Sequence, residues 1–164
     1  MTSLSVFDQL VMHDFAADLP AEWLSRWAAH GRPVSHAGRT RLFSTGDPAN
    51  RFWLINSGSV VLDLPVPGRG DIVIERLRHG SVLGWSWLFA PYRWRFGALV
   101  AEDMHAIEFD AARVRELIAD DPEIGRDLNS RFLAVLADRL HAARGRLAEL
   151  YAYPDDPPDR PTTG

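Results

Sequence analysis

Residues 52–64 read Phe-Trp-Leu-Ile-Asn-Ser-Gly-Ser-Val-Val-Leu-Asp-Leu, two short apolar runs on either side of a polar segment that contains glycine. Short apolar runs bounded by turn-forming residues are typical of β-strands, because helices need longer periodic stretches. The polar segment 56–59 predicts a turn, since Gly58 can adopt the positive φ that many turns require. This stretch therefore predicts two neighbouring strands.

The same pattern extends over most of residues 33–110. Short apolar stretches recur roughly every 8–12 residues, the spacing of an antiparallel sandwich or barrel. They lie at Arg41–Phe43, 72–74, 98–100 and 104–107. Turns rich in glycine and proline are predicted at 45–48, 67–71 and 79–80. We expect residues 33–110 to form a small antiparallel β-structure.

Helical patterns flank this segment on both sides. Apolar residues at helix-like spacing predict two short helices within residues 7–29. A short helix is predicted over 111–119, and a long one begins near Pro122, a residue well suited to a helix start. The predicted fold is α+β, with N-terminal helices in 1–32 and C-terminal helices in 111–152. Residues 153–164 are rich in proline and charge, which predicts a flexible tail after a domain of residues 1–152.

The long helix carries apolar residues, mostly leucines, in two interleaved series, each of which repeats every seven residues. Apolar residues alternating as a and d positions are typical of a coiled-coil seam. We therefore predict a parallel homodimer through the helix from about Glu123 to Tyr151. Its seam would consist of Leu133, Leu136, Leu140, Ala143, Leu147 and Leu150. The alternative is a single wide apolar stripe that faces the core of a monomer.

Three segments, in this order and spacing, link the sequence to a known family. They are residues 43–49, residues 52–60, and Gly80-Ser81-Val82-Leu83-Gly84 followed by Leu88-Phe89. From about Phe7 to Leu150 the chain resembles the cyclic nucleotide-binding domain of catabolite activator and Fnr-like proteins. The resemblance implies an antiparallel β-roll, a double-stranded β-helix of jelly-roll type, followed by a dimerisation helix. It also implies a phosphate-binding cassette, in which a short helix after a glycine and an arginine hold the cyclic phosphate.

The resemblance places the ligand against the segment from Gly84 to Arg95. Backbone N–H groups of Gly84, Ser86 and Trp87 would face the anion, and Arg95 is the best match for the phosphate-binding arginine. Arg93 is within reach of a shifted alignment.

The cassette departs from the family pattern at Trp85. The family has a glutamate here that accepts the ribose 2′-hydroxyl, and indole has no acceptor to replace it. A missing acceptor costs about 1–3 kcal/mol, a tenfold to hundredfold loss of affinity. Phe96 and Gly97 also replace the small hydroxyl residue that follows the family's arginine.

Residues 85–96 hold three of the six tryptophans and two arginines, which suggests two interpretations. The rings and guanidinium groups can form a site for a planar anionic ligand. Cyclic AMP, cyclic GMP and cyclic dinucleotides are then the candidates, or another small anion. Alternatively, the indoles fill the pocket, and the closed barrel serves as a dimeric adaptor for a partner protein. Ser86 could bind the anion or simply cap a helix.

Composition and motifs argue against other functions. The chain has 164 residues, a net charge of −4 and a pI near 5.8, which disfavours broad attraction to nucleic acid or anionic membrane. It has no cysteine, its six histidines lack metal-binding spacing, and no catalytic motif is recognisable. We expect a non-enzymatic protein without a metal or other cofactor.

The ends of the chain complete these expectations. The N-terminus lacks the pattern of a signal peptide and no run is long enough to span a membrane, so we expect a cytoplasmic protein. The 13 residues after Tyr151 are too few for a recognition helix, so no direct DNA binding is expected.

Overall fold

The computed structural model describes residues 3–152. The chain divides into two compact units, Met1–Leu128 and Asn129–Gly164, and the last helix, α4 (Pro122–Ala152), runs from the first into the second. The first unit holds the N-terminal helices, the whole sheet, α3 and the start of α4. The tail predicted at 153–164 lies outside the described residues, and the division of the chain after residue 152 remains a prediction.

The two predicted N-terminal helices are confirmed. They are α1 (Val6–Met12) and α2 (Ala21–Ala28), with a 3₁₀ turn, η1 (Asp14–Ala16), between them. A capping box starts α1. The Asp8 N–H donates to Ser5 Oγ at 3.1 Å, and the Ser5 N–H donates to the Asp8 carboxylate at 3.3 Å. Each α-helix buries an apolar face, through Leu10 in α1 and Trp27 in α2.

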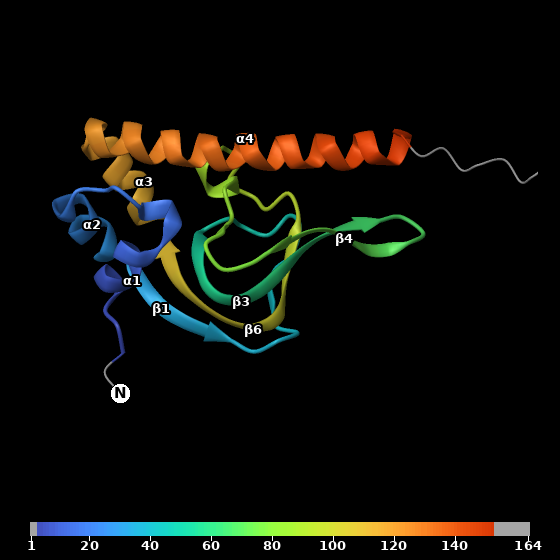
Figure 1. Ribbon diagram of the computed structural model, residues 1–164, viewed down its shortest axis with the longest axis horizontal. Helices are drawn as coiled ribbons and strands as arrows, with labels where there is room; N and C mark the ends of the chain where they lie inside the picture. The colour runs from blue at the N-terminus through green and yellow to red at the C-terminus, as the bar shows by residue number, and fades with distance from the viewer. Residues whose placement is uncertain (1–2, 153–164) are drawn as a thin grey trace, which may run out of the picture. The chain divides into compact units, whose positions relative to one another are not determined.

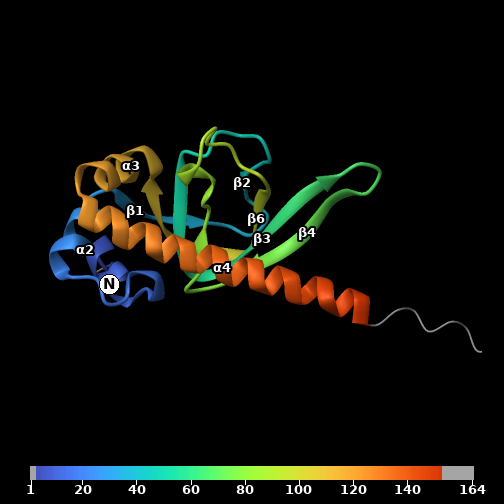
Figure 2. The same cartoon turned by 90° about the horizontal axis from the view of Figure 1, so that it is seen from above.

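The β-roll is confirmed as a six-stranded antiparallel sheet (Figure 1). The main path runs β1-β6-β3-β4, while β2 pairs with β6 and β5 pairs with β3. The strands are β1 (Gly31–His36), β2 (Arg41–Phe43), β3 (Arg51–Val66), β4 (Gly70–Leu77), β5 (Val82–Leu83) and β6 (Gly97–Asp110). Both views place α1 and α2 at one end of the roll and the β3–β4 hairpin extending from the other (Figures 1 and 2).

The predicted turn at 56–59 is wrong, because β3 continues through it. The pairing of β3 with β6 shifts register between Ile55 and Val60, so the strand bends at bulges instead of reversing. Gly58 has a φ of 83°, and a Cβ there would overlap the carbonyl oxygen of Asp103 on β6. Glycine here permits a close approach of two strands. Likewise, the two runs at 98–100 and 104–107 belong to the single strand β6.

Two strands were absent from the prediction. β1 has the sequence Gly-Arg-Pro-Val-Ser-His, which carries little apolar signal. Pro33 is tolerated because β1 is at the end of the main path and pairs only with β6. β5 has two residues, too few for a recognisable pattern.

Four aromatic rings form a continuous stack through the core. Trp27 of α2 lies 5.2 Å from Phe109 of β6, measured between ring centroids. Phe109 lies 4.9 Å from Phe52 of β3, which lies 4.5 Å from Trp87. All four side chains are fully buried. This stack ties the N-terminal helices to the segment that carries the predicted cassette.

The C-terminal helices begin where the sequence predicts. Asp110 caps α3 (Ala111–Asp120) by accepting the N–H groups of Ala112 and Arg113. α4 starts at Pro122, and its first turns bury Ile124 and Leu128 beside Trp27 of α2. Within residues 3–152, no helix combines the length and the apolar character needed to cross a membrane.

Candidate ligand cassette

The predicted cassette follows β5 as a short turn and loop that lead into β6. Gly84 has a φ of 98°, in the left-handed region that favours glycine. The next residues form a single 3₁₀ turn, η2 (Ser86–Leu88). A single 3₁₀ turn therefore lies where the resemblance implies a short helix.

Trp87 is part of the core. Its side chain is fully buried against Phe52, and its indole Nε1–H donates to the carbonyl oxygen of Gly84 at 3.2 Å. This bond closes the turn after Gly84 on itself.

Trp94 fills the space over Gly84. A Cβ at position 84 would lie 2.6 Å from Cη2 of Trp94, so the indole rests on the bare glycine backbone. Trp94 is buried and stacks on Phe43 at 3.8 Å between ring centroids. Sequence reasoning did not select Trp94. Its place between Arg93 and Arg95 was the available signal, because alternation across an extended segment puts neighbours on opposite sides.

Trp85 is the residue that the resemblance predicts at the position of the family's glutamate. Its half-buried ring meets Phe96 edge-on at 5.2 Å, and Phe96 is itself buried. An aromatic pair therefore lines this part of the predicted cassette.

The two arginines of this segment have different surroundings. Arg93 donates from Nη1 to the carbonyl oxygen of Gly46 at 2.9 Å, which fixes the cassette to the turn at 45–48. Arg95 is exposed and, among the described residues, makes no hydrogen bond or ion pair. Arg95 is therefore the one of the two whose guanidinium group makes no hydrogen bond among the described residues.

Ser86 supplies a buried hydroxyl group without a partner. Its Oγ is inaccessible to solvent, and no hydrogen-bond partner lies within reach among residues 3–152. A buried polar group in this state is uncommon in folded proteins.

Arg115 of α3 holds the cassette from outside, a role that sequence reasoning missed. Its Nη1 donates to the carbonyl oxygen of Trp87 at 2.8 Å. The same guanidinium group lies 4.4 Å from the centre of the Tyr92 ring, a cation–π contact. The Arg115 side chain therefore links two points of the loop, Trp87 and Tyr92, to α3.

An ion pair that the sequence analysis also missed lies where β6 begins. Arg41 and Asp63 form two parallel hydrogen bonds of 2.8 Å, and the bonds to Asp63 raise the pKa of Arg41 above its ordinary value. Gly97 makes room for them, because a Cβ there would overlap the Asp63 carboxylate. Gly97 thus has a packing role.

Two cavities of the first unit lie apart from the cassette. They have volumes of about 750 and 420 Å³ and are lined by residues outside 84–95. In the part of the chain that the structure describes, no three His, Asp or Glu side chains are grouped so as to hold a metal ion.

An antiparallel β-roll with a glycine-led turn before its last strand, followed by a long helix, defines the class of cyclic nucleotide sensor domains. Residues 33–121, more than half of the chain, match the family model described as "Cyclic nucleotide-binding domain". The chain belongs to this family.

A curated relative supports the assignment. The chain is 29% identical over 119 residues to a CRP-like cAMP-activated global transcriptional regulator of Mycobacterium tuberculosis, strain H37Rv. The match covers 73% of this chain and 51% of the relative. The chain therefore spans about half the length of the curated relatives it matches.

Solved structures show the same fold. A cyclic nucleotide-binding domain from Methylobacillus flagellatus superposes with a TM-score of 0.75 at 16% identity, over 88% of this chain and 82% of that one. The catabolite activator protein of Thermus thermophilus gives 0.65 at 22% identity, over 84% and 62%. A cAMP-binding acyltransferase from Mycobacterium smegmatis gives 0.65 at 24%, over 83% and 40%. The fold thus occurs in a regulator and in an enzyme.

Proposed function

We propose that this chain is a non-enzymatic regulatory module whose cassette binds a small anionic ligand in an atypical way. The observation that carries the proposal is the buried, unpartnered hydroxyl group of Ser86 within the cassette. It stands at the segment where the family binds a cyclic phosphate. Leaving a buried hydroxyl unsatisfied costs about 1–3 kcal/mol, which a bound anion would recover.

Arg95 is the proposed charge partner of the ligand. Its guanidinium group is unpaired among the described residues, whereas Arg93 is engaged with Gly46. An arginine fork matches the oxygens of a phosphate. Arg95 is also the best match for the family's phosphate-binding arginine, with Arg93 as the alternative, which supports the same assignment.

Trp85 would change the preference for the ligand. An indole at the glutamate position cannot accept the ribose hydroxyl, so cyclic AMP should bind less tightly than in family members that keep glutamate. The ring offers instead a face on which a base or another planar group can stack. We infer that the preferred ligand makes fewer ribose hydrogen bonds and more ring contacts.

A second candidate function is a closed adaptor that binds no nucleotide. The position of Trp94 over Gly84, together with the complete burial of Trp87, favours it. The aromatic side chains would then serve only as core, and regulation would act through a partner protein.

Both candidates use a dimer. In α4, four leucines spaced along one side are each more than half exposed, which supports the proposed coiled-coil seam. They are Leu133, Leu140, Leu147 and Leu150; Leu136 and Ala143 complete the seam. A cytoplasmic location and the absence of direct DNA binding remain predictions.

Titration calorimetry with cyclic AMP, cyclic GMP and cyclic di-GMP separates the two candidates. We expect micromolar binding of at least one of them, lost in Arg95→Ala and retained in Arg93→Ala. Because Arg93 is two residues away and equally charged, it is the matched control. Absence of heat with every nucleotide, from a folded wild-type protein, would instead favour the adaptor.

A further inference from the structure

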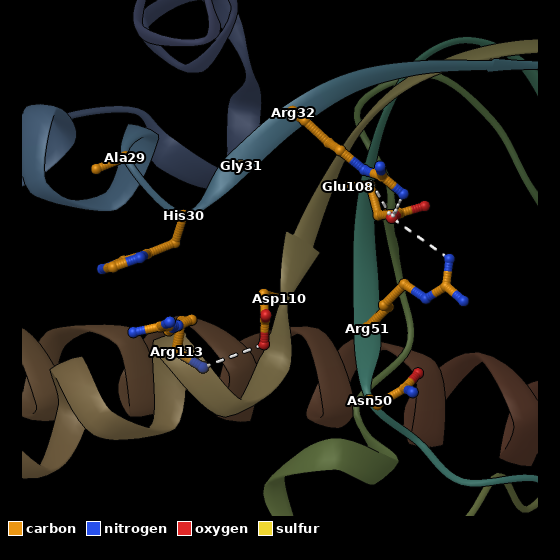
Figure 3. Close-up of a pocket in the computed structure, with 9 residues that line it drawn as sticks. All are labelled: Ala29, His30, Gly31, Arg32, Asn50, Arg51, Glu108, Asp110 and Arg113. Carbon is orange, nitrogen blue, oxygen red and sulfur yellow. Dashed lines mark hydrogen bonds and ion pairs between the residues drawn. The ribbon is translucent and has the colours of Figure 1, made fainter.

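A basic pocket lies in the first unit, apart from the cassette (Figure 3). It has a volume of about 750 Å³ and is lined by residues from the end of α2 and from β1, β3, β6 and α3. Its basic residues are His30, Arg32, Arg51 and Arg113. In Figure 3 the side chains of Arg32 and Arg51 stand on one side, and those of His30 and Arg113 on the other.

A buried carboxylate orders one side of the pocket. Glu108 accepts hydrogen bonds from Arg32 Nη2 at 2.6 Å and Nε at 3.1 Å, and from the Trp53 indole at 3.1 Å. Arg51 Nη1 lies 3.4 Å from the same carboxylate. Burial alone would raise the pKa of Glu108, but these bonds and charges hold it below its ordinary value. Glu108 is therefore an anion that positions two arginines.

The second carboxylate is also engaged. Asp110 Oδ1 accepts the N–H groups of Ala112 and Arg113 at the start of α3, at 3.0 and 3.3 Å. Both acids thus have structural partners and are not open to a cation.

The arginines, by contrast, keep donors free. A guanidinium group has five N–H donors, and Arg51 places only one of them on Glu108. The guanidinium group of Arg113 lies no closer than 4.0 Å to the Glu116 carboxylate, measured from Nη1. The exposed fractions of the side chains are 67% for Arg32, 50% for Arg51 and 64% for Arg113.

The net charge of the pocket lining has the opposite sign to the net charge of the chain. Three arginines and two carboxylates give a lining of +1 with His30 neutral, on a protein whose net charge is −4. Guanidinium groups on two sides of a cavity match an anion with oxygens in several directions, which phosphate provides. The volume lies within the usual range for small-molecule sites.

We propose that this pocket binds a small phosphorylated ligand, independently of the cassette. The phosphate would lie between Arg51 and Arg113. Asn50 and His30 would offer hydrogen bonds to the remainder of the ligand.

NMR on the full chain can test this, because Trp53 donates its indole proton to Glu108 and so reports on the pocket. We expect the Trp53 indole ¹H–¹⁵N signal to shift on addition of inorganic pyrophosphate or ADP at 150 mM NaCl. The dissociation constant should rise about tenfold or more in Arg51→Ala and in Arg113→Ala, since each loses a charge-assisted hydrogen bond. Both side chains are at least half exposed, so the variants should fold.

A control variant and a discriminating variant keep the test specific. Arg69→Ala removes an exposed arginine of the β3–β4 turn and should not weaken pyrophosphate binding. Arg95→Ala removes the cassette arginine and distinguishes the two sites, because only a ligand bound in the cassette depends on it. An equal loss in Arg69→Ala would mean general charge attraction and would overturn the proposal. So would loss in Arg95→Ala, no shift of Trp53, or tighter binding of a hexa-aspartate peptide than of pyrophosphate. Cyclic nucleotide binding that depends on Arg95 is measured separately, so either proposal can fail without the other.

Discussion

Trp94 rests on Gly84 so closely that a methyl group at position 84 would lie 2.6 Å from the indole ring. The glycine that leads the cassette therefore serves two needs, a positive φ and room for a tryptophan. In this chain the turn of the predicted cassette packs against two buried indoles, those of Trp87 and Trp94. Any ligand must be recognised with that indole in place or by displacing it.

Gly84→Ala should lower stability more than a glycine substitution that meets only backbone strain. Gly68 is the matched control, because its φ is 78° and no atom lies within 4 Å of a Cβ there. We expect Gly68→Ala to cost about 1 kcal/mol, and Gly84→Ala to cost a further 1–3 kcal/mol or so from overpacking against Trp94. Urea denaturation measures both. Equal losses would show that Trp94 moves aside freely.

Stability should fall as the pH drops below about 6.5, because of His13. Burial lowers the pKa of this imidazole, and outweighs the bond to Ile55 and the charge of Asp14 that raise it. Its Nδ1 accepts the Phe15 N–H at 3.1 Å, so Nε2 carries the proton and donates to the Ile55 carbonyl oxygen at 3.1 Å. A neutral ring satisfies both bonds, and a second proton would break the first.

Stability falls with falling pH because the folded and unfolded states bind the proton of His13 at different pH values. The unfolded chain takes up the proton at a higher pH than the folded one, so the contribution of His13 is complete above the unfolded pKa. It is lost as the pH falls toward the folded pKa. Thermal unfolding between pH 8 and 5.5 should show this slope in the wild type and in His79→Gln, whose imidazole is exposed. A slope that persists unchanged in His13→Gln would refute the assignment.

Arg115→Ala should loosen the cassette while leaving the rest of the first unit folded. The substitution removes the donor to the Trp87 carbonyl oxygen and the cation over Tyr92. We expect hydrogen exchange of the Leu88 and Tyr92 amides, which close the loop turns, to become about tenfold faster. Arg126→Ala, an exposed arginine at the start of α4, is the control. If both variants exchange at the wild-type rate, Arg115 does not restrain the loop.

Leu140→Glu should convert the proposed dimer to a monomer. It would bury a charge at the centre of the predicted seam, whereas His141→Glu adds the same charge one position away. Sedimentation velocity should give half the wild-type mass for Leu140→Glu and the full dimer mass for His141→Glu. A dimer that survives Leu140→Glu would place the interface elsewhere.

Local signals determined the elements that were predicted well. The bounds of β2 and the starts of α3 and α4 agree with the sequence expectation, because an apolar run, a capping aspartate and a proline act within a few residues. The order of helices, strands and long helix was also readable, and with it the family.

Partners distant in the sequence determined the rest. Residues 56–59 have the composition of a turn, but pairing with β6 and the close approach of Gly58 to Asp103 make them a bulge within one strand. The sequence could show that Trp87, Trp94, Arg93 and Arg95 crowd one segment. It could not assign their roles.

By itself, then, the sequence determined the kind of fold and the family, and it predicts the position of a cassette without its glutamate, since these depend on residue types and spacing along the chain. Only the tertiary structure decided which side chains fill the space over Gly84, which arginine is engaged and which is free, and that Glu108 orders a basic pocket. Such relations depend on which residues share a volume. Burial and hydrogen-bond satisfaction are set by neighbours up to tens of positions away, and no local pattern records them.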